Sequence, residues 1–170
     1  MDYTALTLDH FRDLLPSGHQ RLVHFHPSDA FLMKMQNADV LTSGLIGDPE
    51  ALERYQELHK GPALTLIENK RPTFCMGLHM RPDGWVEPWV KLTKQASIKL
   101  VIRMIRRALS LIDIELVAQI GGRDEYEEAV CERFMARFGF EPNGDKTLYE
   151  VQRGKLMMTL KPKERGVPCL

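Results

Sequence analysis

A group of basic residues at helical spacing is the first feature of this sequence that could do chemistry. Lys99, Arg103, Arg106 and Arg107 would lie together on one side of a helix. Such a face could hold the phosphate groups of a cofactor, a nucleic-acid backbone or an acidic protein surface. It could equally be the solvated side of an ordinary helix. No aromatic residues interleave with it to stack on bases, so we do not expect nucleic acid as the partner.

Histidine and cysteine, the usual ligands of transition metals, do not form a clear metal site. His24 and His26 lie two apart and would share one face of a strand, with His19 nearby, but no carboxylate completes a ligand set. The three cysteines form neither a CxxC pair nor an even set for disulfides, namely Cys75, Cys131 and Cys169. We therefore expect no metal cofactor and a reducing compartment, which is typical of a cytoplasmic protein of a host cell or a virus.

Length and charge favour one globular domain spanning residues 1–170. The 170 residues contain 23 Lys plus Arg and 23 Asp plus Glu, so the formal net charge is zero and does not favour an anionic membrane. The first residues lack the apolar run of a secretory signal, and no stretch is long enough to cross a bilayer. Neither GxxxxGK[ST] nor GxGxxG occurs, which argues against nucleotide hydrolysis and Rossmann-type binding.

Hydrophobic periodicity divides the chain into a front part (1–60), a sheet-forming part (61–161) and a loose tail (162–170). The front part predicts a helix over 7–15, a strand over 21–26, a helix from Pro27 to about Gln36 and a helix starting at Asp48. The next segment predicts strands over 63–68, 73–79 and 85–92, with a turn over 69–72. These strands would form an antiparallel meander.

The remaining periodic segments predict a mixed sheet. A helix over 98–112 connects the meander to an apolar strand over 114–120, and such a crossover makes neighbouring strands parallel. A second helix begins near Asp124 and ends at Gly139, in a left-handed conformation with Phe140 folded back as a clasp. A hairpin of 147–151 with 156–161 closes the chain. The predicted fold class is α/β, an α+β arrangement with a mixed sheet of six to seven strands flanked by helices.

Pro88 interrupts the third strand of the meander. Because proline has no N–H group, it removes a ladder hydrogen bond and occurs at strand edges and bulges. A bulge at this position would splay the third strand from the parallel strand over 114–120. The alternative is an ordinary bulge on an edge strand.

This element order, with the helix end Glu132-Arg133-Phe134-Met135-Ala136-Arg137-Phe138-Gly139-Phe140-Glu141-Pro142, resembles the GNAT N-acetyltransferase superfamily. The resemblance covers roughly residues 60–161, and its style is closest to the GNAT-like proteins of tailed bacteriophages. It implies acetyl-CoA as the cofactor. In that family the splayed strand pairs with the pantetheine arm, and the following loop and helix start hold the diphosphate.

Carried onto this sequence, the resemblance implies a cofactor site over the end of the third strand and the loop that follows. The loop contains no glycine, so the close backbone approach that glycine allows is lost. A weakened cofactor site and a simple capped helix start both remain open. The implied cofactor-binding residues are Trp89, Val90, Lys91, Lys94, Gln95, Ala96 and Ser97.

The resemblance also implies catalytic positions. Glu87, on the splayed strand, matches the usual general base, and Glu68 on a neighbouring strand is a second candidate. The family's tyrosine that protonates the departing thiolate falls on Met135, which cannot donate a hydrogen bond. A common asparagine falls on Glu128.

Tyr149 and Tyr126 are the candidate replacements for the missing thiolate donor. Three functions follow from these residues. One is an acetyl-CoA-dependent N-acyltransferase with an unidentified acyl acceptor. Another is a catalytically inactive GNAT-fold phage protein that serves as a virion or interaction component, with phage structural proteins as partners. A minor third is a small host-directed inhibitor that uses the basic helix face.

Overall fold

A seven-stranded mixed sheet runs through the part of the chain that the structure, a computed structural model, describes: residues 6–15, 18–35, 56, 58–82, 84–119, 125–142 and 157–161. The strand order is β1-β2-β3-β4-β5-β7-β6. All neighbours pair antiparallel except β4 and β5, which are parallel. The predicted fold class is therefore confirmed. The strands are β1 (Gln20–His24), β2 (Ala63–Glu68), β3 (Arg71–Met80), β4 (Val86–Leu92), β5 (Leu116–Gln119), β6 (Glu141–Pro142) and β7 (Met157–Leu160).

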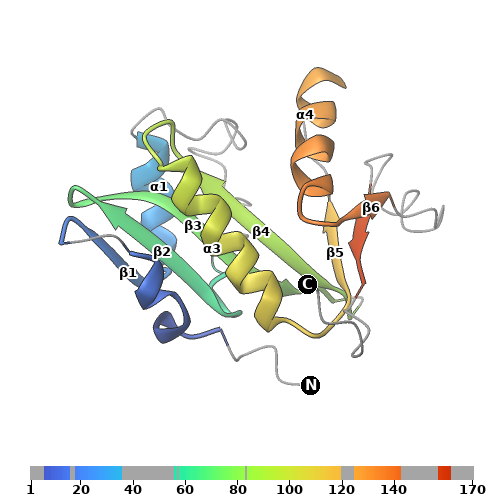
Figure 1. Ribbon diagram of the computed structural model, residues 1–170, viewed down its shortest axis with the longest axis horizontal. Helices are drawn as coiled ribbons and strands as arrows, with labels where there is room; N and C mark the ends of the chain where they lie inside the picture. Colours follow the sequence, from blue (N-terminus) through green and yellow to red (C-terminus); the bar gives the residue numbers. More distant parts are fainter. Residues whose placement is uncertain are drawn as a thin grey trace.

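Helices cover both faces of the sheet (Figure 1). Helix α3 (Ile98–Leu111) crosses one face with the 3-10 helix η2 (Leu8–Leu14) beside it, and α1 (Pro27–Met35) lies on the opposite face. The apolar stripe of α3 is buried against the sheet because its members recur at helical spacing. This stripe consists of Leu100, Val101, Met104, Ile105 and Ala108.

The connection between β2 and β3 is shorter than predicted. Asn69 and Lys70 have φ angles of 51° and 65°, so both turn residues are in the left-handed region. Two-residue hairpin turns of this kind match the right-handed twist of the strands that they connect. The predicted turn over 69–72 is therefore wrong in its second half, and Pro72 belongs to β3. A register shift between Leu66 and Ile67 leaves Thr73 as the extra residue in this ladder.

The end of helix α4 (Glu125–Ala136) follows the prediction. Gly139 has a φ of 87°, and the Phe140 N–H donates to the Met135 carbonyl at 3.4 Å. Phe140 is 3% exposed and packs in the main core. In the closing part, β7 pairs with β6, whereas the predicted strand over 147–151 lies outside the described residues.

The front of the chain is fixed to α3 by an ion pair. The Arg107 guanidinium donates to the Asp13 carboxylate at 2.8 Å and to the His10 carbonyl at 3.3 Å. The predicted start of a helix at Asp48 lies outside the described residues. No helix in the described ranges is long and apolar enough to cross a membrane.

Candidate functional site

The two edges of β4 define an opening in the sheet. Seven consecutive residues of β4 pair with β3, from Met80 with Val86 to Phe74 with Leu92. Toward β5, the described residues form a single pair, Val86 with Leu116. In Figure 1 the two strands start side by side and then run in different directions. The predicted splay near Pro88 is therefore present.

The direction of the backbone groups of β4 explains where the opening lies. The Leu78 N–H donates to the Pro62 carbonyl at 3.0 Å, just before β2, so the backbone of Leu78 faces β2. Backbone groups alternate between the two neighbouring strands, so Pro88, which is opposite Leu78, faces β5. By the same alternation Val90 and Leu92 also face β5. Within the described residues their backbone N–H and C=O groups have no strand partner.

Pro88 therefore acts by its missing N–H group and not by a bulge. The register between β3 and β4 is continuous through the Leu78–Pro88 pair, so the predicted bulge is wrong. Proline is tolerated here because the backbone nitrogen of residue 88 does not face β3, so the β3–β4 ladder needs no N–H group at this position. Toward β5, proline has no N–H group to donate. The ladder with β5 ends at Val86, two residues before Pro88.

Glu87 lies at the narrow end of this opening. Its neighbour Val86 is buried in the core beneath α3, so alternation places the Glu87 side chain on the sheet face that carries α1. It is half-buried and pairs directly with His79 on β3. Side chains at such paired positions have Cβ atoms about 5 Å apart. Glu87 and His79 thus occupy opposite positions of the β3–β4 ladder beside the opening.

The other end of the opening is formed by the loop between β4 and α3. Lys94 and Gln95 are exposed in this turn, whereas Ala96 is 7% exposed and packs in the core. Ser97 precedes α3 without a side-chain capping bond. The first backbone N–H groups of a helix have no partner inside the helix and favour anions. The loop therefore presents an anion-binding helix end without glycine.

Glu68 already places a carboxylate at this helix end. Its Oε2 accepts hydrogen bonds from the Thr73 hydroxyl at 2.5 Å and from the Ser97 N–H at 3.4 Å. Its Oε1 accepts a bond from the Gln20 amide at 2.6 Å. The side chain is 9% exposed. The network holds a negative charge at the start of α3, on the sheet face opposite to Glu87.

Trp89 and Lys91 lie on the α1 face, away from the helix start. Both pair with β3, at Gly77 and Cys75. The Trp89 ring meets the Phe25 ring edge-on at 5.0 Å, and its buried Nε1 has no hydrogen-bond partner among the described residues. Lys91 is 4% exposed. Of the predicted cofactor residues, Trp89 and Lys91 thus lie on the α1 face, Val90 packs on the α3 face, and the other four lie in the loop before α3.

The predicted thiolate-donor region is apolar in the described structure. Met135 packs against the main core from α4, and its carbonyl accepts the bonds that end the helix. Tyr149 lies outside the described residues, as do the side chains of Tyr126 and Glu128. The side chains of all four tyrosines of the chain lie outside the described residues.

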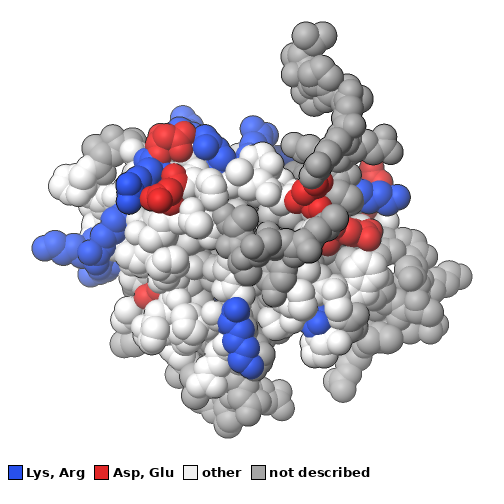
Figure 2. All heavy atoms as spheres, turned by 90° about the horizontal axis from the view of Figure 1, so that it is seen from below, with Lys and Arg blue, Asp and Glu red and all other residues white. Residues whose placement is uncertain are grey.

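The predicted basic face of α3 is only partly available for a ligand. Lys99, Arg103 and Arg106 are exposed, whereas Arg107 is occupied by Asp13. Figure 2 shows basic side chains in several separate groups and not in one large patch on the face it presents. No three His, Cys, Asp or Glu side chains converge within the described ranges, and His26 bonds to the Ser28 hydroxyl at 2.7 Å.

Sequence reasoning missed the residue opposite Glu87 and the hydrogen-bond partners of Glu68. His79 could have been found by aligning β3 and β4 about their turn, because that alignment sets it opposite Glu87. Gln20 and Thr73 had no comparable signal. Gln20 lies 48 positions before Glu68, and Thr73 reaches it only through the register shift in β3.

Comparisons with known proteins agree with this architecture. No protein-family model and no curated protein sequence matches the chain. Among solved structures, it resembles the putative acetyltransferase yncA from Salmonella typhimurium, with a TM-score of 0.50, 18% identity, and 89% of this chain and 99% of that one covered. For Arabidopsis thaliana Naa50 the TM-score is 0.54 at 13% identity, with 85% and 99% covered.

A third similar structure is a putative GNAT-family acetyltransferase from Desulfovibrio desulfuricans, with a TM-score of 0.53, 19% identity, and 84% of this chain and 98% of that one covered. At these identities the likeness establishes the fold. The protein thus has the fold of the GNAT N-acetyltransferases, as the element order predicted.

Proposed function

We propose that this protein is an acyl-CoA-dependent N-acyltransferase of the GNAT type. The observation that carries the proposal is the open edge of β4, where the backbone groups of Val90 and Leu92 face a gap between two parallel strands. Buried backbone groups are almost always paired in native proteins. An extended ligand with amide groups would complete this edge as an added strand does.

The pantetheine arm of CoA fits this edge. It is a narrow chain with two amides, which match the alternating N–H and C=O groups of Val90 and Leu92. The similar Salmonella structure contains acetyl-CoA, and the Arabidopsis structure contains a bisubstrate analogue of CoA. When bound, the cofactor supplies an acyl thioester. The residues of β4 would hold its arm and orient the thioester toward the narrow end of the gap.

The diphosphate of CoA fits less well. Glu68 already accepts a hydrogen bond from the Ser97 N–H at the start of α3. A second anion at that point would be repelled by the buried carboxylate. The structure therefore favours binding through the arm, and we assign no step of the reaction to the nucleotide end.

Glu87 is our candidate for the general base. Its side chain lies on the α1 face of the sheet. The loop after β4 leads into the start of helix α3, which lies on the opposite face. A donor and an amine acceptor could therefore meet through the gap from opposite faces. Glu87 would accept the amine proton, and His79 would orient its carboxylate. Tyr149 remains the predicted thiolate donor.

One experiment tests the proposal. Acetyl-CoA at one hundred times its Kd should raise the free energy of unfolding by about 2.7 kcal/mol. The melting temperature should rise accordingly. Acetyl transfer to a panel of amines is followed by product mass. Glu87→Gln should lower transfer by about a hundredfold or more and leave acetyl-CoA binding unchanged, because only the proton acceptor is lost. Glu141→Gln, at an exposed strand position, is the control. An unchanged melting temperature at millimolar acetyl-CoA would refute the proposal.

A second function, a GNAT-fold protein without catalysis, is favoured by two observations. Glu68 occupies the helix start, and Met135 stands where the family has a proton donor. Such a protein would act as a structural or interaction component, and a phage particle is the setting that we predict. Binding of acetyl-CoA without transfer to any amine would support this second function over the first.

A further inference from the structure

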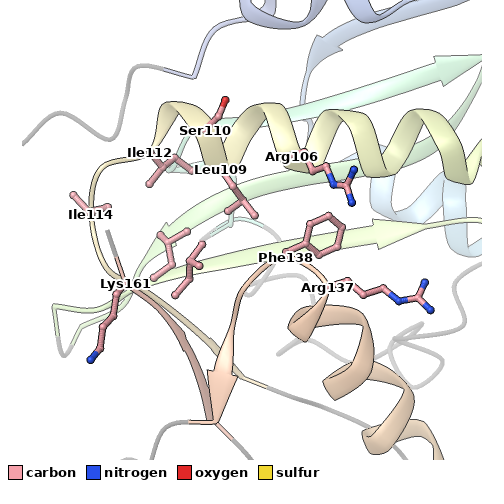
Figure 3. Close-up of a pocket in the computed structure, with 10 residues that line it drawn as sticks. Arg106, Leu109, Ser110, Ile112, Ile114, Arg137, Phe138 and Lys161 are labelled. Atoms are coloured by element: carbon pink, nitrogen blue, oxygen red, sulfur yellow. The ribbon is translucent and has the colours of Figure 1, made fainter. Parts of the chain in front are cut away.

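A cleft of about 330 Å³ lies between the C-terminal half of α3 and the end of α4. Figure 3 shows it from the side, with α3 above and the turn after α4 below. Its volume is at the lower end of the range for small-molecule sites. Its lining combines the apolar side chains of Leu109, Phe138 and Leu160 with the cations of Arg106, Arg137 and Lys161.

The floor of the cleft is apolar. Leu109, Phe138 and Leu160 are partly exposed and pack against the main core, which continues beneath them. Leu116, at the paired end of β5, is completely buried. Apolar side chains in a concave surface gain free energy when an apolar group displaces water from them.

The polar lining of the cleft has one sign of charge. Arg106 comes from α3, Arg137 from the turn after α4, and Lys161 follows β7. No carboxylate lines the cleft, and none of the three cations forms an ion pair with another described residue. In Figure 3 the Arg106 side chain extends from α3 toward the ring of Phe138. Three cations around one hollow repel each other until an anion joins them.

This cleft is separate from the opening beside β4. Arg106 lies nine residues beyond Ser97, which is about 13 Å along the axis of a helix. The cleft also lies near Leu116, at the end where β4 and β5 are paired, and not where they separate. A ligand here would not share the helix start with Glu68.

We propose that the cleft binds a small amphipathic anion, namely a carboxylate or phosphate group on a short aliphatic chain. The aliphatic part would cover Leu109, Phe138 and Leu160, and the anionic group would lie among Arg106, Arg137 and Lys161. The proposal rests on the cleft alone and is independent of acyl transfer.

Calorimetric titration with defined probes tests this inference. Octanoate should bind, and affinity should rise about fourfold for each CH₂ group from butanoate to octanoate, since each buried CH₂ contributes about 0.8 kcal/mol. Octanamide, which has the same chain without the charge, should bind at least about tenfold more weakly. Octyl phosphate compared with octanoate identifies which anionic group is preferred, and tight binding of either one supports the site.

Variants locate the binding. The triple variant Arg106→Gln, Arg137→Gln, Lys161→Gln should lose about tenfold in octanoate affinity, because three exposed charges each contribute a modest amount. Lys99→Gln, on the same helix about 10 Å from Arg106, is the matched control and should bind octanoate normally. The inference is overturned if neither octanoate nor octyl phosphate binds, if octanamide binds as well as octanoate, or if the triple variant binds the preferred anion as tightly as the control.

Discussion

The two edges of β4 differ sharply in how they pair with their neighbouring strands. Seven residue pairs connect β4 with β3 in a continuous register, whereas one pair connects it with β5. The same seven residues thus belong to a closed ladder on one side and to an opening on the other. The sequence of the strand alone does not distinguish the edges, because alternation assigns backbone groups to them in turn.

Within this one strand, the edge that faces β3 contributes to stability, and we assign ligand binding to the edge that faces β5. The closed edge brings Gly77 and Trp89 into contact and fixes the position of Glu87. The open edge leaves the Val90 and Leu92 backbone available to a ligand. Substitutions that act on the closed edge should therefore change stability, and those near the open edge should change binding.

The largest effect is expected at Gly77, on the closed edge. A Cβ atom there would lie 2.7 Å from the Ala63 Cβ and 2.8 Å from both the Pro62 carbonyl oxygen and the Trp89 ring. Gly77→Ala should lower the free energy of unfolding by about 2 to 3 kcal/mol, because backbone on one side cannot yield. Gly18→Ala is the control, with nothing within 4 Å of the added atom. Equal denaturation midpoints for the two variants would show that the closed edge is not tightly packed.

A smaller difference should appear in amide hydrogen exchange along β4. The Val90 N–H faces the opening, whereas the Trp89 and Lys91 N–H groups face β3. Val90 should exchange at least about tenfold faster than its two neighbours, because it lacks a ladder partner. Acetyl-CoA should slow the exchange of Val90 and leave Trp89 and Lys91 unchanged. Equal exchange rates for the Val90, Trp89 and Lys91 amides would show that the β5-facing edge of β4 is not open.

The smallest effect concerns the carboxylate at the end of the open edge. Glu68→Gln keeps the size of the side chain and removes its charge. CoA affinity should rise about threefold, since one repulsive interaction of less than about 1 kcal/mol is relieved. Pantetheine, which has no phosphate, should bind the variant and the unaltered protein equally. Weaker CoA binding by the variant would show that the carboxylate supports the ligand.

Local sequence signals predicted the fold well. Strand β2 spans the predicted residues 63–68, and α3 begins at the predicted residue 98. Gly139 and Phe140 form the predicted helix end because a glycine stop and a hydrophobic clasp depend on neighbours in the chain. The predicted turn after β2 is too long because Lys70 adopts a left-handed φ, which is uncommon for lysine and cannot be predicted from the residue type.

The candidate site could be predicted only in outline. Pro88 indicated the splay, but the reason is the direction in which its nitrogen points, and this depends on the register with β3. The contacts of Glu68 come from β1, β3 and the start of α3, so no sequence period connects them. Arg106, Arg137 and Lys161 likewise come from three segments that meet only in the folded chain.

The buried thiol of Cys75 has a practical consequence. It is 0% exposed on the α1 face, where it bonds to the Met33 sulfur at 3.3 Å and lies 3.5 Å from the Thr65 hydroxyl. An alkylating reagent can reach it only after α1 separates from the sheet. The rate at which Cys75 is modified therefore measures how often α1 separates from the sheet. No cysteine has to be introduced for this measurement, and the peptide that carries Cys75 is read separately from the one that carries the partly exposed Cys131.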